Sequence, residues 1–307
     1  GKQRLFLLSH PDEVGTVLIT RHDTWIRGKV MEPFQMAMGQ DGLLTGEGAS
    51  WKSQRQAVHP EFSPARVAHD RPTLVAVVGQ HLQQAQKHAS FDLLEWCKRL
   101  TLQVIMGRLF GPDPTDLLEP LFEVVHDLDH FWNVPSIFLY ADSEGFDDYR
   151  QRWLDKMARL DHLIYQLLQR QPQPILNHYL GLGDRQRLRD AAVTFLLTGF
   201  DTAASGIYWT LDQLLAHPEA MDQASQQSPW LTASVQEALR LYPPVWYLGR
   251  EAVSDTHLGG YVVPAGSLAI TSPYLIHRNP RLWPDPEEFR PRRFIQATPP
   301  ARTYLPF

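Results

Sequence analysis

The most informative segment of this sequence reads LLTGFDTAAS and spans residues 196–205. It lies inside a pattern that predicts one long helix over residues 184–216, which at 1.5 Å per residue would run about 50 Å. Apolar residues surround a small polar patch at its centre, where the acid Asp201 directly precedes the alcohol Thr202. Gly199 is a poor helix former, and a threonine hydroxyl can bond to a carbonyl one turn back. The helix is therefore expected to loosen there into a local bulge.

Two interpretations of this polar patch are open from the residues alone. In the first, Gly199, Asp201 and Thr202 lie on the solvated face of an ordinary helix. In the second, the helix is buried, and the bulge, the acid and the hydroxyl open around a small ligand and pass protons to it. The other motifs of the chain bear on this choice.

The composition is that of a folded protein from a reducing compartment. Its 307 residues are 43% hydrophobic, enough to bury a large core as one domain, or two at most. The net charge is −5, and no Lys/Arg-rich run stands out, so a nucleic-acid partner is not expected. A single cysteine, Cys97, excludes an internal disulfide. Because Cys97 falls on the apolar stripe of a helix pattern, we expect a buried structural thiol rather than a metal ligand.

No apolar run in the sequence reaches the length needed to cross a membrane. We therefore expect a soluble, cytoplasmic protein. The chain begins at Gly1 directly before a strand-like stretch, which leaves open a membrane anchor upstream of that residue.

The residue patterns predict a mainly α-helical (α+β) fold. Helical periodicity dominates residues 41–244, whereas residues 1–40 and 245–307 form a β-rich part. Within that part, residues 261–263 and 268–270 flank the turn sequence Pro-Ala-Gly, and we expect them to form a hairpin.

Three further groups of residues carry expectations: a helix cap, an ion pair and an aromatic cluster. Ser228 precedes Pro229 and is expected to cap the helix that carries Glu237 and Arg240. Those two residues are three apart among apolar neighbours, so a partly buried ion pair is expected. The aromatic residues of the middle region could wall an apolar pocket, although such clusters are more often plain core. They are Phe131, Trp132, Phe138 and Tyr140.

Trp51 and Arg55 are four residues apart and therefore share one face of a predicted helix. An indole N–H and a guanidinium that point the same way suit a carboxylate or a phosphate. On spacing alone, a cation–π pair on a surface helix is an equally good interpretation.

Taken together, these motifs resemble the cytochrome P-450 superfamily, the haem-thiolate monooxygenases. Five patterns occur in the family's order and at plausible spacings. They are Trp51-x-x-x-Arg55, GFDT at residues 199–202, Glu237-x-x-Arg240, an arginine at Arg250, and FRPRRF at residues 289–294. The resemblance implies the cytochrome P-450 fold, with a large helical region and a small β-rich part.

The resemblance also implies a role for each matching residue. Trp51, Arg55 and Arg250 would bind the propionates of haem b, and Gly199 belongs to the motif beside the cofactor. Asp201 and Thr202 would be catalytic, relaying the protons that O–O cleavage consumes. A structural Glu–Arg–Arg cluster would consist of Glu237, Arg240 and Arg293.

One departure from the family pattern concerns the metal ligand. The family places its axial cysteine in a loop that begins with a phenylalanine, and Phe307 resembles that first residue. No residue of this chain is therefore expected to bind the iron, and the axial cysteine is expected to lie beyond Phe307. We accordingly expect residues 1–307 to form a single cytochrome P-450 domain that is truncated at both ends.

The expected activity is insertion of one O2-derived oxygen atom into a small apolar organic substrate, with a weak lean to a fatty acid or another lipid. Electrons would come from NAD(P)H through a ferredoxin or a flavin reductase. Two alternatives stay open: a non-catalytic ligand-binding protein of the same fold, and a haem-dependent isomerase or dehydratase. The Asp201–Thr202 pair argues against both, because neither needs a proton relay to oxygen.

Overall fold

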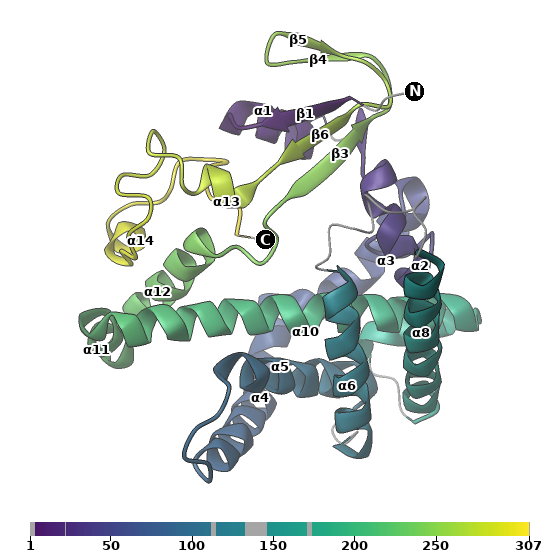
Figure 1. Ribbon diagram of the computed structural model, residues 1–307, viewed down its shortest axis with the longest axis vertical. Helices are drawn as coiled ribbons and strands as arrows, with labels where there is room; N and C mark the ends of the chain where they lie inside the picture. The colour runs from purple at the N-terminus through teal and green to yellow at the C-terminus, as the bar shows by residue number, and fades with distance from the viewer. Residues whose placement is uncertain (1–3, 22, 112–114, 133–145, 171–173, 307) are drawn as a thin grey trace. The chain divides into compact units, whose positions relative to one another are not determined.

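A computed structural model describes residues 4–21, 23–111, 115–132, 146–170 and 174–306 of the chain (Figure 1). Phe138, Tyr140 and Phe307 lie outside the described residues, and the side chains of Phe131 and Trp132 are likewise not described. The expectations for the aromatic pocket wall and for the loop starting at Phe307 therefore stay predictions.

The described chain divides into two compact units, of which one spans Met31–Asp201 and the other comprises Gly1–Val30 and Thr202–Phe307. The expectation of a single domain over residues 1–307 stays a prediction. Among the described helices, none is both long enough and apolar enough to cross a lipid bilayer.

The unit Met31–Asp201 is built from helices. They are α2 (Glu32–Met38), α3 (Gly48–Val58), the 3-10 helix η3 (His59–Phe62), α4 (Pro64–Ala85), α5 (Leu93–Phe110), α6 (Thr115–Trp132), α8 (Phe146–Leu168), the 3-10 helix η4 (Pro174–Leu176), α9 (Asn177–Gly181) and the first part of α10 (Arg185–Ala216). Local capping sets several ends: the Asp92 carboxylate accepts the Glu95 N–H at the start of α5. At the other end of α5, Gly111 has a positive φ of 94°, which stops the helix.

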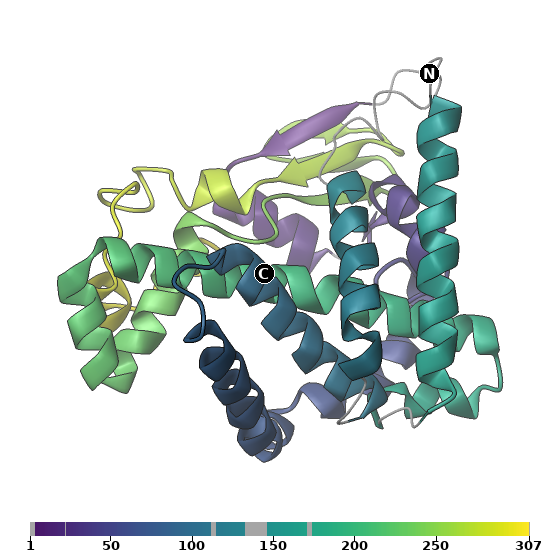
Figure 2. The same ribbon diagram turned by 60° about the horizontal axis from the view of Figure 1, so that its bottom comes forward.

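Apolar side chains of α5, α6, α8 and α10 form the core of this unit, with Leu102, Leu128, Ile164 and Leu196 fully buried. Figures 1 and 2 show α6 and α8 running alongside each other, as their contacts require. The interior position of α10 in this core shows that the helix before Asp201 is not an ordinary surface helix.

The second unit contains two small sheets and several helices. Its strands are β1 (Leu5–Leu8), β2 (Trp25–Ile26), β3 (Leu248–Ala252), β4 (Thr256–Leu258), β5 (Tyr261–Val263) and β6 (Leu268–Thr271). Its helices are α1 (Pro11–Gly15), the π-helix η1 (Thr16–Thr20), the 3-10 helix η2 (Gly28–Met31, which reaches the unit boundary), the second part of α10, α11 (Pro218–Gln226), α12 (Ser228–Leu241), α13 (Pro273–Ile276) and α14 (Arg292–Gln296).

Four strands form one sheet in the order β1-β6-β3-β2, with β1 parallel to β6 and the other pairs antiparallel (Figure 1). Trp25, Ala252 and Ala269 lie in the buried cluster beneath this sheet. Helices α10, α11 and α12 share a second cluster, in which Leu214 and Leu241 are buried. The mainly α (α+β) class predicted from the sequence is confirmed.

The predicted hairpin between residues 261–263 and 268–270 is wrong. Strand β5 pairs instead with β4, and β6 joins the four-stranded sheet. The reason lies in the two-residue turn between β4 and β5, where Gly259 and Gly260 have φ values of 57° and 83°. Two successive positive φ values suit a tight hairpin turn, and glycine adopts them without strain.

The long central helix was predicted within one residue of its observed bounds. However, α10 is continuous from Arg185 to Ala216, so the expected local bulge around Gly199 is not formed. The expected cap of α12 is also wrong by one position: Gln227 is the N-cap residue and Ser228 is already helical. The buried side chains of α10 explain its regular geometry, because tertiary packing readily overrides weak local preferences. The start of α12 is exposed, and its cap differs from the expected one by a single position.

Candidate functional site

The middle of α10 carries an acid that is paired across helices. The Nζ atom of Lys98, on α5, lies 3.0 Å from the Oδ1 atom of Asp201. The Lys98 side chain is 10% exposed and that of Asp201 is 34% exposed. Thr202 follows directly on the same helix and is half-buried. The acid and the alcohol are thus neighbours at a half-buried position, which fits neither a fully solvated face nor a sealed interior.

Lys98 was not expected from the sequence. It directly follows Cys97 in α5, and its side chain is 10% exposed. A lysine inside an otherwise apolar stripe was the available signal, because lysine is rarely buried without a partner. That signal does not name the partner, which lies about a hundred positions further along the chain.

Threonine hydroxyls along α10 bond to carbonyls one turn back. Thr194 donates to Asp190 O at 2.7 Å, Thr198 donates to Thr194 O at 2.6 Å, and Thr210 donates to Gly206 O at 2.7 Å. Back-bonding thus occurs at three other threonines of this helix, and the helix absorbs it without a break. The same bond expected for the Thr202 hydroxyl stays a prediction.

Gly199 lies where α10 approaches α5. A Cβ atom added at this glycine would stand 3.2 Å from Cδ1 of Ile105, which is a tight contact. The structure thus gives Gly199 a role in helix–helix packing, and its role toward a cofactor stays a prediction.

A second group of charged residues forms a compact cluster on α12 and the C-terminal segment. Glu237 and Arg240 are both completely buried, and two parallel hydrogen bonds of 2.8 and 2.9 Å join the guanidinium to the carboxylate. Arg293 of α14 donates from Nε to Glu237 Oε1 at 2.9 Å. The predicted members Glu237, Arg240 and Arg293 are therefore in contact, and the burial of the first two is complete rather than partial.

The remaining hydrogen-bonding groups of Arg240 are also used. It donates to the carbonyl oxygens of His277, Pro286 and Glu288 at 2.7, 2.7 and 3.1 Å. A buried charge is tolerated when its partners satisfy all of its hydrogen bonds. This cluster ties α12 to three separate loop positions and has the features of a structural clamp.

Trp51 and Arg55 share one face of α3, as predicted, and the Arg55 guanidinium carbon lies 5.5 Å from the centre of the Trp51 ring. The cation–π contact that the spacing allowed is thus present. Arg55 is exposed, and its cationic donors beside an indole suit a haem propionate as well. Arg250 lies on β3, half-buried, with Nη1 donating to Gly249 O at 2.7 Å. The chemistry of these donors fits the acidic edge of a haem.

Cys97 does not fit the role of a haem ligand. Its side chain is completely buried, and burial, followed by the nearby Asp92 carboxylate, raises the pKa of the thiol to about 11. The thiol is therefore protonated at neutral pH, whereas a metal ligand must be a thiolate. The expectation of a buried structural thiol is confirmed.

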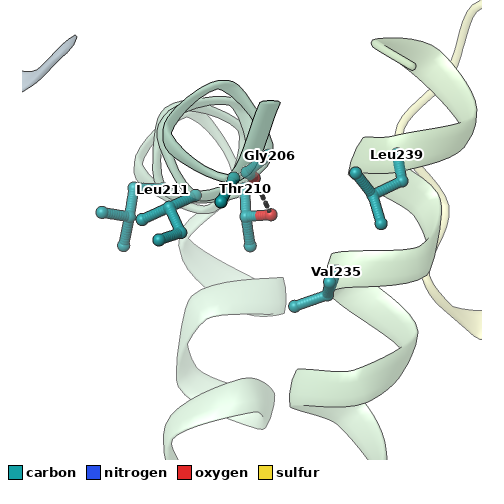
Figure 3. A pocket seen from close by; sticks show the side chains of 7 residues that line it. Gly206, Thr210, Leu211, Val235 and Leu239 are labelled. Carbon is teal, nitrogen blue, oxygen red and sulfur yellow. Dashed lines mark hydrogen bonds between the residues drawn. The ribbon is translucent and has the colours of Figure 1, made fainter. Parts of the chain in front are cut away.

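An apolar cavity of about 330 Å³ lies between α10 and α12 (Figure 3). It is lined by Ala203, Gly206, Ile207, Thr210, Leu211, Val235 and Leu239. Figure 3 shows that the Thr210 hydroxyl turns back to its own helix, where it bonds to Gly206 O. Aliphatic groups are what this space can accept favourably.

Comparison with known proteins identifies the relatives of this chain. A sequence profile described as cytochrome P450 matches residues 1–307. The chain belongs to the cytochrome P450 family. Putative cytochrome P450 132 of Mycobacterium tuberculosis (strain H37Rv) is 28% identical, over 99% of this chain and 76% of that protein.

Two solved P450 structures, both from Thermus thermophilus, are similar to this one. A 6-coordinated cytochrome P450 from one strain has a TM-score of 0.80 and 26% identity, covering 98% of this chain and 76% of its own. CYP175A1 from another strain has a TM-score of 0.81 and 27% identity, covering 99% of this chain and 74% of its own. Both the family and the P450 fold expected from the motifs are confirmed.

Family membership places the chain among the haem-dependent monooxygenases as a class. Such oxidoreductases bind haem iron and use O2, an organic substrate and a redox partner. The individual site residues are not tested by this similarity, so their roles stay predictions.

Proposed function

We propose that this P450 inserts one oxygen atom of O2 into a small apolar substrate, a fatty acid or another lipid. In this proposal the protein works in the cytoplasm, and electrons come from NAD(P)H through a ferredoxin or a flavin reductase. The observation that carries it is the acid–alcohol pair Asp201–Thr202 at a half-buried position on α10, with a lysine beside the acid. Haem, when bound, supplies the oxidising chemistry.

In this proposal the polar patch of α10 moves protons. The Thr202 hydroxyl both donates and accepts hydrogen bonds, so it can pass a proton inward without carrying a charge. Asp201 is 34% exposed, which lets its carboxyl exchange protons with water, while Lys98 beside the acid limits its orientations. The well-packed helix before this patch keeps bulk water away from one side of it.

The cationic residues Arg55 and Arg250, together with the Trp51 indole, would hold the two carboxylates of the cofactor. Each is a hydrogen-bond donor of the kind that recognises carboxylates. The buried cluster of Glu237, Arg240 and Arg293 has no proposed part in proton transfer, because its donors and acceptors already bond to one another and to the backbone.

The test is the coupling ratio, that is, product formed per NAD(P)H consumed, of the haem-loaded full-length protein that includes the cysteine-ligand loop. Thr202→Ala is expected to lower this ratio while NAD(P)H consumption continues, and Thr202→Ser, which keeps the hydroxyl, is expected to restore it. Thr210→Ala is the matched control on the same helix, because that hydroxyl bonds within the helix to Gly206 O. A ratio in Thr202→Ala equal to that of the parent would contradict the proposal.

A further inference from the structure

His277 is a completely buried histidine directly after α13 that bonds at both ring nitrogens. Its Nδ1 atom lies 2.9 Å from Arg240 O, and its Nε2 atom lies 2.7 Å from the backbone nitrogen of Leu305. An amide N–H can only donate and a carbonyl can only accept. Nε2 must therefore be unprotonated and Nδ1 must carry the proton, which fixes one neutral tautomer.

The contact between His277 and Arg240 runs in both directions. While the imidazole donates to Arg240 O, the Arg240 guanidinium donates back to His277 O at 2.7 Å. Arg240 is itself fixed by its two bonds to Glu237. The imidazole is thus held by Arg240, whose side chain is in turn fixed by Glu237. Its Nε2 atom accepts the hydrogen bond of the Leu305 N–H and so connects the backbone of Leu305 to this pair.

The surroundings of His277 keep its ring neutral. Burial is the main cause that lowers its pKa to about 4, and the Arg240 and Arg278 cations act in the same direction, while the bond to Arg240 O opposes them. The charged and titratable groups around it are Arg240 and, through Arg240, Glu237 on α12, together with Arg278 in the next position and Tyr304 on the C-terminal segment.

The segment that His277 holds has a second, aromatic anchor. The Tyr304 hydroxyl donates to Gln236 O of α12 at 3.0 Å, and its ring lies 5.6 Å from that of His277 and 5.0 Å from that of Phe294. Two neighbouring residues of the C-terminal segment are therefore attached to α12, Tyr304 directly and Leu305 through the imidazole. The resemblance to the family predicts that the loop with the axial cysteine begins two residues after Leu305.

We propose that His277 is a positioning residue, whose neutral imidazole links the buried Glu237–Arg240 pair to the Leu305 backbone and so fixes the approach to the haem-ligand loop. This inference rests on the proposed haem function. It assigns a distinct task to a histidine that belongs to none of the motifs by which the family was recognised.

The two nitrogens can be tested separately by two amide variants. In His277→Asn, the side-chain amide can take the place of Nδ1 and keep the bond to Arg240 O, but it is too short to reach Leu305. In His277→Gln, the longer side chain can present its oxygen to the Leu305 N–H. His81 is the control, because it is also buried and bonds through Nε2 to Gln103 Oε1 at 2.6 Å, with both residues in the unit Met31–Asp201.

The experiment uses the haem-loaded full-length protein that includes the cysteine-ligand loop. It measures amide hydrogen exchange at Leu305 and the reduced carbon-monoxide spectrum, which reports thiolate ligation. His277→Asn is expected to speed exchange at Leu305 about tenfold, the loss of one buried hydrogen bond, and to diminish the thiolate spectrum. His277→Gln and His81→Asn are expected to resemble the parent in both. Unchanged exchange in His277→Asn, or faster exchange with a fully retained thiolate spectrum, overturns the inference.

Acidification of the parent provides the second measurement, needed if His277→Asn does not fold. The folded-state pKa of about 4 lies below the ordinary 6.5, so the stability contributed by neutral His277 is complete above about pH 6.5 and is lost as the pH falls through about 4. Exchange at Leu305, corrected for its intrinsic pH dependence, should rise over that interval in the parent and not in His277→Gln. A rise of equal size in both overturns the inference. If the unmutated protein shows no thiolate spectrum, the proposed haem function fails. The exchange rates then still decide whether His277 holds the Leu305 backbone.

Discussion

The cluster on α12 and the polar patch of α10 both place an acid beside a base, but they bury them to different extents. Glu237 and Arg240 are 0% exposed, and the guanidinium also bonds to three carbonyl oxygens. Asp201 is 34% exposed, and its Oδ1 atom lies 3.0 Å from the Lys98 ammonium. The Glu237–Arg240 pair can therefore only hold structure, whereas the acid of the Asp201–Lys98 pair can still reach water.

The physical basis of this difference is desolvation. A fully buried carboxylate is costly unless every lone pair has a donor, so such a pair is retained in a single geometry and cannot exchange protons cheaply. A partly exposed acid keeps part of its hydration, so its pairing with a cation contributes less to stability. We therefore expect the Asp201–Lys98 pair, at the site proposed for proton transfer, to contribute less to the free energy of unfolding than the Glu237–Arg240 pair.

The largest effect is expected for Glu237→Gln. This change leaves Arg240 as a buried cation without its counter-charge and replaces one of the two carboxylate oxygens that accept from its guanidinium by an NH2 group. Breaking one side of a buried ion pair typically costs about 3–5 kcal/mol, and we expect a loss of unfolding free energy in that range. Urea unfolding followed by tryptophan fluorescence measures it.

Glu288→Gln is the matched control for that change. The Glu288 carboxylate is 65% exposed and lies 3.7 Å from Arg290, while its backbone oxygen, which accepts from Arg240, is not altered. An exposed pair of this kind contributes less than about 1 kcal/mol. If Glu237→Gln and Glu288→Gln lost the same small amount of unfolding free energy, the cluster would not be a structural clamp.

An intermediate effect is expected for Lys98→Met, which keeps the aliphatic volume in α5 but removes the ammonium beside Asp201. For a half-buried pair we expect a loss of about 1–2 kcal/mol in unfolding free energy. A double-mutant cycle with Asp201→Asn isolates the pair itself and should give a coupling of about 1 kcal/mol.

Lys156→Met provides the reference for a pair at the surface, since Lys156 and Asp127 join α8 to α6 with side chains that are 31% and 51% exposed. The loss of unfolding free energy in Lys156→Met should be smaller than that in Lys98→Met. A coupling for Lys98 and Asp201 as large as the effect of Glu237→Gln would mean that both pairs are structural, and the distinction between them would fail.

Much of this arrangement could be predicted from the sequence, because local patterns determine it. The stop at His217-Pro218 set the end of α10, and the spacing of Glu237 and Arg240 put both on one face of α12. The contact of that pair with Arg293 was predicted by resemblance to the family, since nothing local relates residues 56 positions apart.

The parts that sequence did not predict depend on partners that are distant in the chain. Lys98 is explained only by Asp201, and His277 only by Arg240 and Leu305. The hairpin was misassigned because two glycine-containing turns compete in one short region, and local propensity does not say which strands they join. The bulge expected at Gly199 was overridden by the packing of α10 against α5.

The smallest change in unfolding free energy is expected for Gly199→Ala, because a gain in helix propensity is opposed by a steric contact. Replacing glycine by alanine inside a helix favours folding by about 1 kcal/mol. The new methyl group would lie 3.2 Å from Cδ1 of Ile105, which must move by a few tenths of an ångström. We expect a net change in unfolding free energy of less than about 1 kcal/mol, because that atom is the end of a flexible side chain.

Gly79→Ala calibrates the helix term, since a Cβ atom at Gly79 in α4 has no neighbour within 4 Å and should give the full gain. The difference between the two alanine variants then measures how firmly α5 holds α10 next to the polar patch. Ile105→Ala removes both crowding atoms, Cδ1 at 3.2 Å and Cγ1 at 3.3 Å, so adding it to Gly199→Ala should recover the gain seen at Gly79, relative to Ile105→Ala alone. A penalty at Gly199 well above about 1 kcal/mol that Ile105→Ala does not relieve would mean that the patch is as rigid as the α12 cluster. The lower burial of Asp201 would then no longer indicate a more adaptable site.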